Sequence, residues 1–186
     1  MTETQTGVRV ELAREGIANV ATGLPVLDHL VGELADSARF KLSLEVAPGS
    51  ADEAVAAAGR ALGGSLGGLI AANAGRGWAL APADEALALA ALDRDEEPRL
   101  VTNVDFSDQR VGGLATDVAS RFLQELALAA GLNLHVRLVE GTDPQHVLAA
   151  IFKAVGAALG QACRPADALT PAAPPTPDLR HEREDS

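Results

Sequence analysis

The chain has 186 residues and a net charge of −11, and 47% of its residues are hydrophobic, which is enough to bury the core of one domain. It has no lysine- or arginine-rich run and only five aromatic residues, so we expect no nucleic-acid partner. The N-terminus lacks a signal-peptide pattern and no long uninterrupted apolar stretch appears, so we expect a cytoplasmic protein with no membrane partner. A single cysteine, Cys163, excludes an internal disulfide.

The first half of the chain predicts strands and helices in alternation. Apolar residues at every second position predict strands at 8–12 and 40–46. Helical spacing predicts a helix over 24–38 before the second strand and another over 52–72 after a short turn. These elements describe one strand–helix–strand–helix unit.

The second half predicts the same order of elements. A helix over 116–131 leads into a strand at 132–139, then a turn and a helix over 146–162. From residue 164 onward the chain holds five of its ten prolines and a charged end, so we expect 164–186 to be a disordered tail.

The repeated order indicates an α+β fold with an internal duplication. Glu33-Leu34-Ala35 overlays Glu125-Leu126-Ala127 at an offset of 92 residues. Overlaying Arg60-Ala61-Leu62 on Ala157-Ala158-Leu159 instead gives 97, which predicts a deletion of five residues in the first turn. We therefore expect half-repeats at 1–92 and 93–163.

The last predicted helix carries two polar residues on one face. Its apolar stripe runs from Val147 to Leu159, and His146 and Lys153 lie opposite, about two turns apart and separated by small residues. From this helix alone, a solvent face with two unrelated polar residues is the favoured interpretation, and the remnant of an inherited site is the alternative. The choice depends on the rest of the chain.

Several segments, in order, resemble imidazoleglycerol-phosphate dehydratase, an enzyme of histidine biosynthesis. They are ATGLPVLDHL (21–30), PADEALALAALD (82–93) and LNLHVRLVEGTDPQHVLAAIFKAVGAAL (132–159). The resemblance implies a duplicated two-layer sandwich, like domain 2 of ribosomal protein S5, in which two helices back a four-stranded sheet in each half. It also favours an inherited site on the face of His146 and Lys153.

The resemblance implies two manganese ions held by histidines and glutamates and completed between subunits. His29, His135 and His146 fall on ligand positions of the family. Other ligand positions hold Gln145 and Ala149 in the second half. In the first half, an offset of 97 places them at Pro48, Gly49 and Asp52. We therefore expect at most one weak manganese site.

The resemblance also implies residues that bind a small phosphorylated imidazole ligand. Arg76 and Lys153 match phosphate-binding positions, whereas Glu97 stands where the family has an arginine and would repel phosphate. Glu3 matches a proposed acid/base residue. Asp84 and Glu85 are further acid/base candidates, although adjacent carboxylates also suit a helix N-terminus or a strand edge.

Two functions follow from the resemblance. The first is a paralogue that keeps the fold with lost or strongly reduced dehydratase activity and serves in binding or assembly. The second is an active, divergent dehydratase, a hydro-lyase. We expect a homo-oligomer, most simply a trimer packed through the small-residue helix faces, because the shared metal sites that would join trimers are incomplete.

Overall fold

The computed structural model describes residues 6–105, 110–111 and 114–166. The first half contains strands β1 (Gly7–Leu12), β2 (Ile17–Ala21) and β3 (Phe40–Glu45) and helices α1 (Pro25–Ala38) and α2 (Ala51–Ala71). The second half contains strands β4 (Arg76–Ala83), β5 (Ala86–Arg94), β6 (Arg99–Thr102), β7 (Arg110–Val111), β8 (Leu114–Ala115) and β9 (Leu132–Glu140), and helices α3 (Thr116–Ala130) and α4 (Pro144–Ala162).

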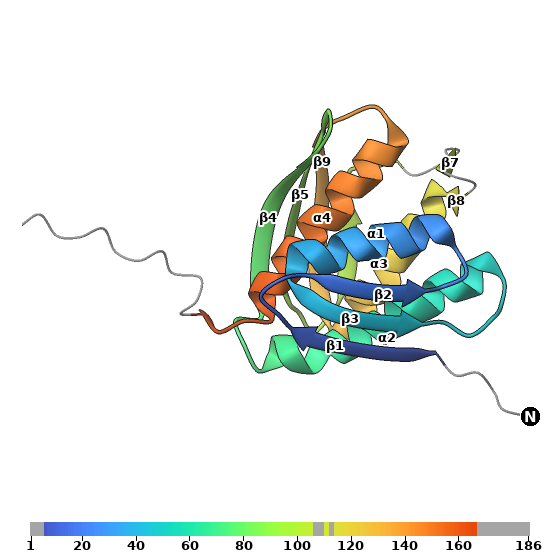
Figure 1. Ribbon diagram of the computed structural model, residues 1–186. Helices are drawn as coiled ribbons and strands as arrows, with labels where there is room; N and C mark the ends of the chain where they lie inside the picture. Colours follow the sequence, from blue (N-terminus) through green and yellow to red (C-terminus); the bar gives the residue numbers. More distant parts are fainter. Residues whose placement is uncertain (1–5, 106–109, 112–113, 167–186) are drawn as a thin grey trace, which may run out of the picture.

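Two sheets enclose the helices (Figure 1). The first sheet has the strand order β1-β3-β2, and the second has the order β4-β5-β9-β6. Each sheet is backed by the two helices of its own half. The halves meet helix to helix, α1 on α4 and α2 on α3, and the buried leucines, valines, phenylalanines and alanines form one core.

Strand registers confirm the predicted duplication. Leu42 of β3 and Leu134 of β9, 92 residues apart, each pair with one antiparallel and one parallel neighbour: Val10 and Ala18 for Leu42, Leu92 and Leu100 for Leu134. The preceding helices end alike, on a left-handed residue at Arg39 (φ 55°) and Gly131 (φ 71°). The same backbone path is therefore built twice.

The predicted five-residue deletion in the first turn is wrong. The N-caps of α2 and α4, Ser50 and Asp143, lie 93 residues apart. Gly63 and Gly156, also 93 apart, sit where an added Cβ would lie 2.4 Å from the Leu126 carbonyl oxygen and 2.2 Å from the Leu34 carbonyl oxygen. Similar alanine-rich helical turns allowed an overlay that was one turn out of register.

The predicted boundary between residues 92 and 93 divides strand β5. Strands β4 and β5 pair in the second sheet with β9, so the halves divide in the connection between α2 and β4. The first sheet has three strands within the described residues, where four were predicted. The predicted tail also begins too early, because the Arg164 guanidinium donates hydrogen bonds to the carbonyl oxygens of Ala13, Ala38, Arg39 and Gly160.

Sequence periodicity did not reveal the β4–β5 hairpin because both faces of β5 are apolar. Ala88 and Ala90 are fully buried and face helix α4, whereas Leu87 and Leu89 lie half-buried on the opposite face. Small residues under α4 let the helix approach the sheet closely. Alternation between alanine and leucine therefore marks a close helix contact and not a polar surface.

Helix α2 is the one described helix that is long and apolar enough to span a membrane by length and composition. Half of that stretch is buried inside the fold, where it packs on α3. Packing within the core accounts for its composition.

Candidate functional site

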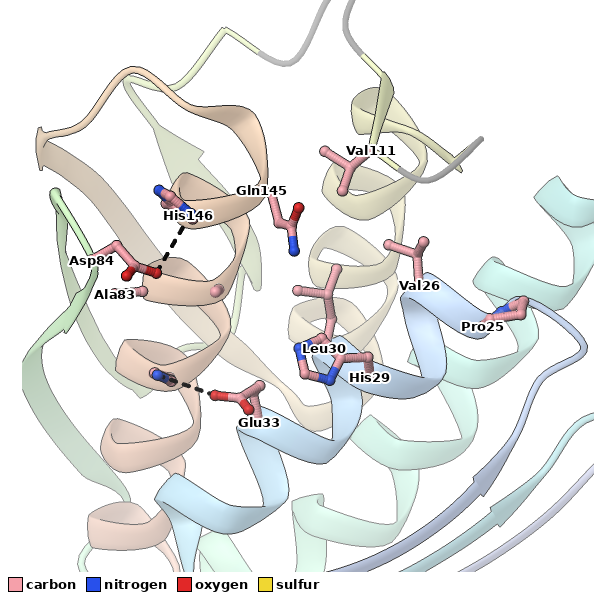
Figure 2. Close-up of a pocket in the computed structure, with 12 residues that line it drawn as sticks. Pro25, Val26, His29, Leu30, Glu33, Ala83, Asp84, Val111, Gln145 and His146 are labelled. Carbon is pink, nitrogen blue, oxygen red and sulfur yellow. Dashed lines mark ion pairs between the residues drawn. The ribbon is translucent and has the colours of Figure 1, made fainter.

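A cavity of about 410 Å³ opens between α1, α4 and the turn that joins β4 to β5 (Figure 2). It brings together four of the predicted site residues, His29, Asp84, His146 and Lys153. The other lining residues are Pro25, Val26, Leu30, Glu33, Ala83, Val111, Gln145 and Ala149. Residues from both halves thus meet at one opening, with apolar walls and a few polar side chains.

His29 is placed by the first turn of α1. Pro25 starts the helix, where a missing N–H costs nothing. The Asp28 carboxylate accepts hydrogen bonds from the Thr22 backbone N–H (2.9 Å) and hydroxyl (2.5 Å). This contact fixes the entry to the helix, so the neighbouring His29 is held at the cavity.

His146 is placed by the first turn of α4. The Asp143 carboxylate caps the helix by accepting hydrogen bonds from the backbone N–H groups of Gln145 (2.8 Å) and His146 (3.4 Å). The predicted stripe, with Val147 and Leu148 at its start, is buried. The face with His146 and Lys153 is not a solvent face, because Gly156 packs on α1.

Asp84 and Glu85 form the two-residue turn of the β4–β5 hairpin, so they lie at a strand end and not at a helix N-terminus. Asp84 has φ 49°, in the left-handed region that aspartate tolerates. The Glu85 carboxylate contacts Nδ1 of His146 and accepts the Asp143 backbone N–H at 3.0 Å. Oδ2 of Asp84 lies 3.4 Å from Nε2 of His146.

These contacts shift the pKa values of both partners. The hydrogen bond from the Asp143 N–H, followed by that with His146, lowers the pKa of Glu85 to about 2. The hydrogen bond with Glu85 raises the pKa of His146, against a smaller effect of burial. Both imidazole nitrogens of His146 therefore face carboxylates, which favours the protonated ring.

Lys153 lies on one side of the same cavity and is already paired. Its ammonium is 3.2 Å from Oε2 of Glu33, and about a third of each side chain is exposed. Figure 2 shows Glu33 with its ion pair drawn as a dashed line, below the Asp84–His146 pair. Sequence reasoning missed Glu33 because its partner is 120 residues away and only the packing of α1 on α4 brings them together.

His135 and Arg76 lie elsewhere. Both line a broad open depression of about 1200 Å³ with Trp78, Asp93 and Asn133. His135 alternates with the buried Leu134 and Val136, so it points to the sheet face away from the helices. Within one chain, the two predicted phosphate contacts, Arg76 and Lys153, belong to different surfaces.

The remaining predicted positions contribute little to the cavity. Glu3 lies outside the described residues. Glu97 lies beyond the far end of β5, about 30 Å along the strand from Glu85, so it cannot act at this cavity. Arg76 of β4 lies opposite Asp93 of β5 in the strand register, at that same far end of the sheet.

The residues present do not fit a two-manganese site within one chain. The helix offset of 93 moves the first-half counterparts of Gln145, His146 and Ala149 to Asp52, Glu53 and Ala56. The Glu53 carboxylate is used by the Ser50 N–H and hydroxyl in a capping box. Across the described part of the chain, no group of three or more His, Cys, Asp or Glu side chains is arranged so that it could hold a metal ion.

Comparisons with known proteins agree on one family. The family model of imidazoleglycerol-phosphate dehydratase matches residues 22–159. The enzyme of Desulforudis audaxviator is 36% identical over 169 residues, covering 86% of each chain. The chloroplastic enzyme of Pisum sativum is 35% identical over 168 residues, covering 86% of this chain but only 59% of the pea protein.

Solved structures show the same fold. Imidazoleglycerol-phosphate dehydratase from Staphylococcus aureus superposes with a TM-score of 0.79 at 26% identity, covering 89% of this chain and 96% of that one. The Pyrococcus furiosus structure matches with a TM-score of 0.76 at 23% identity, covering 90% and 94%. The predicted duplicated α+β sandwich is thereby confirmed, and the chain belongs to the imidazoleglycerol-phosphate dehydratase family.

Proposed function

We propose that this protein keeps the dehydratase fold of histidine biosynthesis but has lost, or strongly reduced, the dehydratase activity. The observation that carries the proposal is the composition of the cavity. Only two of its residues, His29 and His146, are histidines at ligand positions of the family, and His146 is held by two carboxylates. A cytoplasmic location is part of the proposal.

The chemistry explains why these losses matter. Dehydration of a sugar-like chain builds charge on the imidazole ring and expels hydroxide, and metal ions stabilise that charge when bound. Gln145 and Ala149 offer no imidazole or carboxylate on α4. Losing metal ligands or their supporting groups typically costs about 10- to 100-fold in metal affinity or activity for each group.

An active, divergent dehydratase is the second candidate. His29, His146 and Lys153 converge on one cavity, and the chain is 36% identical to the Desulforudis audaxviator enzyme. Asp84 and Glu85 add carboxylates beside His146. In this candidate they supply acid/base groups.

Two measurements on the purified protein separate these candidates. Metal analysis after dialysis against excess Mn²⁺ is expected to find less than about one ion per chain. Assay with imidazole glycerol phosphate is expected to show negligible dehydration. Two tightly bound ions per chain, or turnover in the common enzyme range of about 1 to 10³ per second, would establish the active enzyme.

We also propose that the chain forms a homo-oligomer, most simply a trimer. Gly156 is not available for the predicted subunit contact through small-residue helix faces, because it packs on α1 inside the chain. The outer face of the second sheet is a better contact surface, since Trp78 and Leu80 are 64% and 53% exposed there. Their neighbours on strand β5, Ala91 and Leu89, are also apolar. A second copy would also be needed to bring Arg76 or His135 to the cavity of another chain.

A further inference from the structure

The charges that line the cavity do not favour an anion. The lining contains the carboxylates of Glu33 and Asp84, the ammonium of Lys153 and the imidazoles of His29 and His146, and the His146 ring is held between Asp84 and the neighbouring Glu85. Lys153 is paired with Glu33 at 3.2 Å, and the whole chain carries a net charge of −11. A phosphate entering here would have to displace Glu33 from Lys153 and would then lie beside that carboxylate.

We propose that Glu33 sets the ligand class of this cavity: by holding the Lys153 ammonium, it makes the cavity select a small imidazole that carries a positive charge over one that carries a phosphate or carboxylate. The proposal concerns the cavity of the proposed function and rests on it. It differs from the phosphorylated imidazole ligand that the family resemblance implied.

The geometry gives each part of such a ligand a place. Val26, Leu30, Ala83 and Ala149 provide an apolar wall for a flat ring, and 410 Å³ accommodates a ring with a short side arm. Asp84 faces Nε2 of His146 at 3.4 Å but keeps 72% of its side chain exposed, so it can also contact a cationic arm. Glu33 faces Lys153, and both Glu85 and Asp84 face His146, so the carboxylates around the cavity outnumber its cations by one even with His146 protonated.

Three small probes test the proposal by calorimetry on the full chain. Histamine has an imidazole ring with a cationic arm, imidazole-4-acetate has the same ring with an anionic arm, and inorganic phosphate has the anion alone. Histamine is expected to bind at least about fivefold more tightly than imidazole-4-acetate, the ratio that about 1 kcal/mol of exposed charge interaction gives. Phosphate is expected not to bind measurably.

Glu33→Gln tests the role assigned to Glu33. It keeps the shape and frees the Lys153 ammonium, so imidazole-4-acetate and phosphate should gain about fivefold or more while histamine loses affinity. Glu125→Gln is the matched control, because Glu125 pairs with Arg60 on the other side of the molecule and neither residue lines the cavity. Lys153→Gln provides a second variant, which should bind imidazole-4-acetate more weakly than the unmodified protein does.

Each outcome decides the proposal. The proposal is overturned if phosphate binds the unmodified protein as tightly as histamine or more tightly, or if none of the three probes binds. It is also overturned if Glu33→Gln leaves the order of the probe affinities unchanged. Phosphate binding without dehydration of imidazole glycerol phosphate overturns this inference alone. Efficient dehydration overturns both it and the loss of activity.

Discussion

Lys153 of α4 and Glu33 of α1 form an ion pair of 3.2 Å that the other half of the molecule repeats with Arg60 of α2 and Glu125 of α3, also at 3.2 Å. Lys153 follows Arg60 by 93 residues and Glu125 follows Glu33 by 92, which are the offsets of their helices. The internal duplication therefore extends from the backbone to a specific charge pair.

Double-mutant cycles should give unequal coupling for the two pairs. Lys153 and Glu33 are both about a third exposed, so we expect coupling of about 0.5 kcal/mol, typical of partly solvated pairs. Glu125 is only 15% exposed; burial tends to raise its pKa, but hydrogen bonds from Arg121 and Arg60 lower it overall. The Arg60–Glu125 coupling should therefore be larger, measured by urea denaturation at neutral pH, and equal coupling would contradict this.

The helix contacts predict opposite effects for two adjacent glycines. In Gly63→Ala the new Cβ would meet the Leu126 carbonyl oxygen, so we expect a loss of about 1–3 kcal/mol of unfolding free energy. A Cβ added at Gly64 would have nothing within 4 Å, so Gly64→Ala should gain about 0.5–1 kcal/mol through helix propensity. Denaturant unfolding of both variants decides this, and a destabilised Gly64→Ala would show that the helix interface is misplaced.

The Glu85–His146 contact should depend on pH. The pKa of Glu85 is lowered from 4.5, so its contribution to stability is present above 4.5 and is lost as pH falls toward about 2. The pKa of His146 is raised from 6.5, so its contribution is full below 6.5 and is lost as pH rises through the higher folded value. The contact should be strongest between pH 4.5 and 6.5.

Titration of His146 followed by NMR checks this contact. Glu85→Gln should lower the pKa of His146 clearly, because the Glu85 hydrogen bond is the largest cause of its shift. Asp84→Asn should lower it less, since Asp84 lies farther away, at 3.4 Å. A larger effect from Asp84→Asn would reverse the assignment of the two carboxylates.

Arg164 should act as a structural clamp. Its guanidinium joins carbonyl oxygens at the ends of α1 and α4 and in the β1–β2 loop. Arg164→Met should therefore cost about 2 kcal/mol, the range for hydrogen bonds from a charged donor. A chain ending at Ala166 keeps the clamp and should unfold at the same temperature as the full chain, whereas one ending at Cys163 should not.

Assembly should depend on the outer face of the second sheet. Trp78→Asp places a charge on that face and should convert the expected trimer to monomer, measured by light scattering coupled to size exclusion. Leu128→Asp is the control, because Leu128 is 46% exposed but lies on α3, which covers the opposite face of that sheet. The size should not change between Mn²⁺ and EDTA; a large shell that dissociates in EDTA would show a bridging metal site.

Local sequence patterns determined the helices, the strands β3 and β9, and the 92-residue repeat. Each of these elements buries one face, and the apolar period of 3.6 or 2 residues records that face directly. The shared face of His146 and Lys153 followed from the same periodicity. The missing histidines are also a property of sequence alone, because residues 30–134 contain none.

Tertiary structure decided what those residues do. The ion pair of Glu33 with Lys153 and the enclosure of His146 by Asp84 and Glu85 join residues 120 and about 61 positions apart, and no local period encodes such contacts. The correct alignment of α2 with α4, its counterpart in the second repeat, likewise came from the packing of Gly63 and Gly156. Sequence did not give this alignment, because alanine-rich helical turns resemble one another. The sequence shows which residues are polar, whereas helix packing and the β4–β5 hairpin determine their partners, because a residue's neighbours depend on the whole fold.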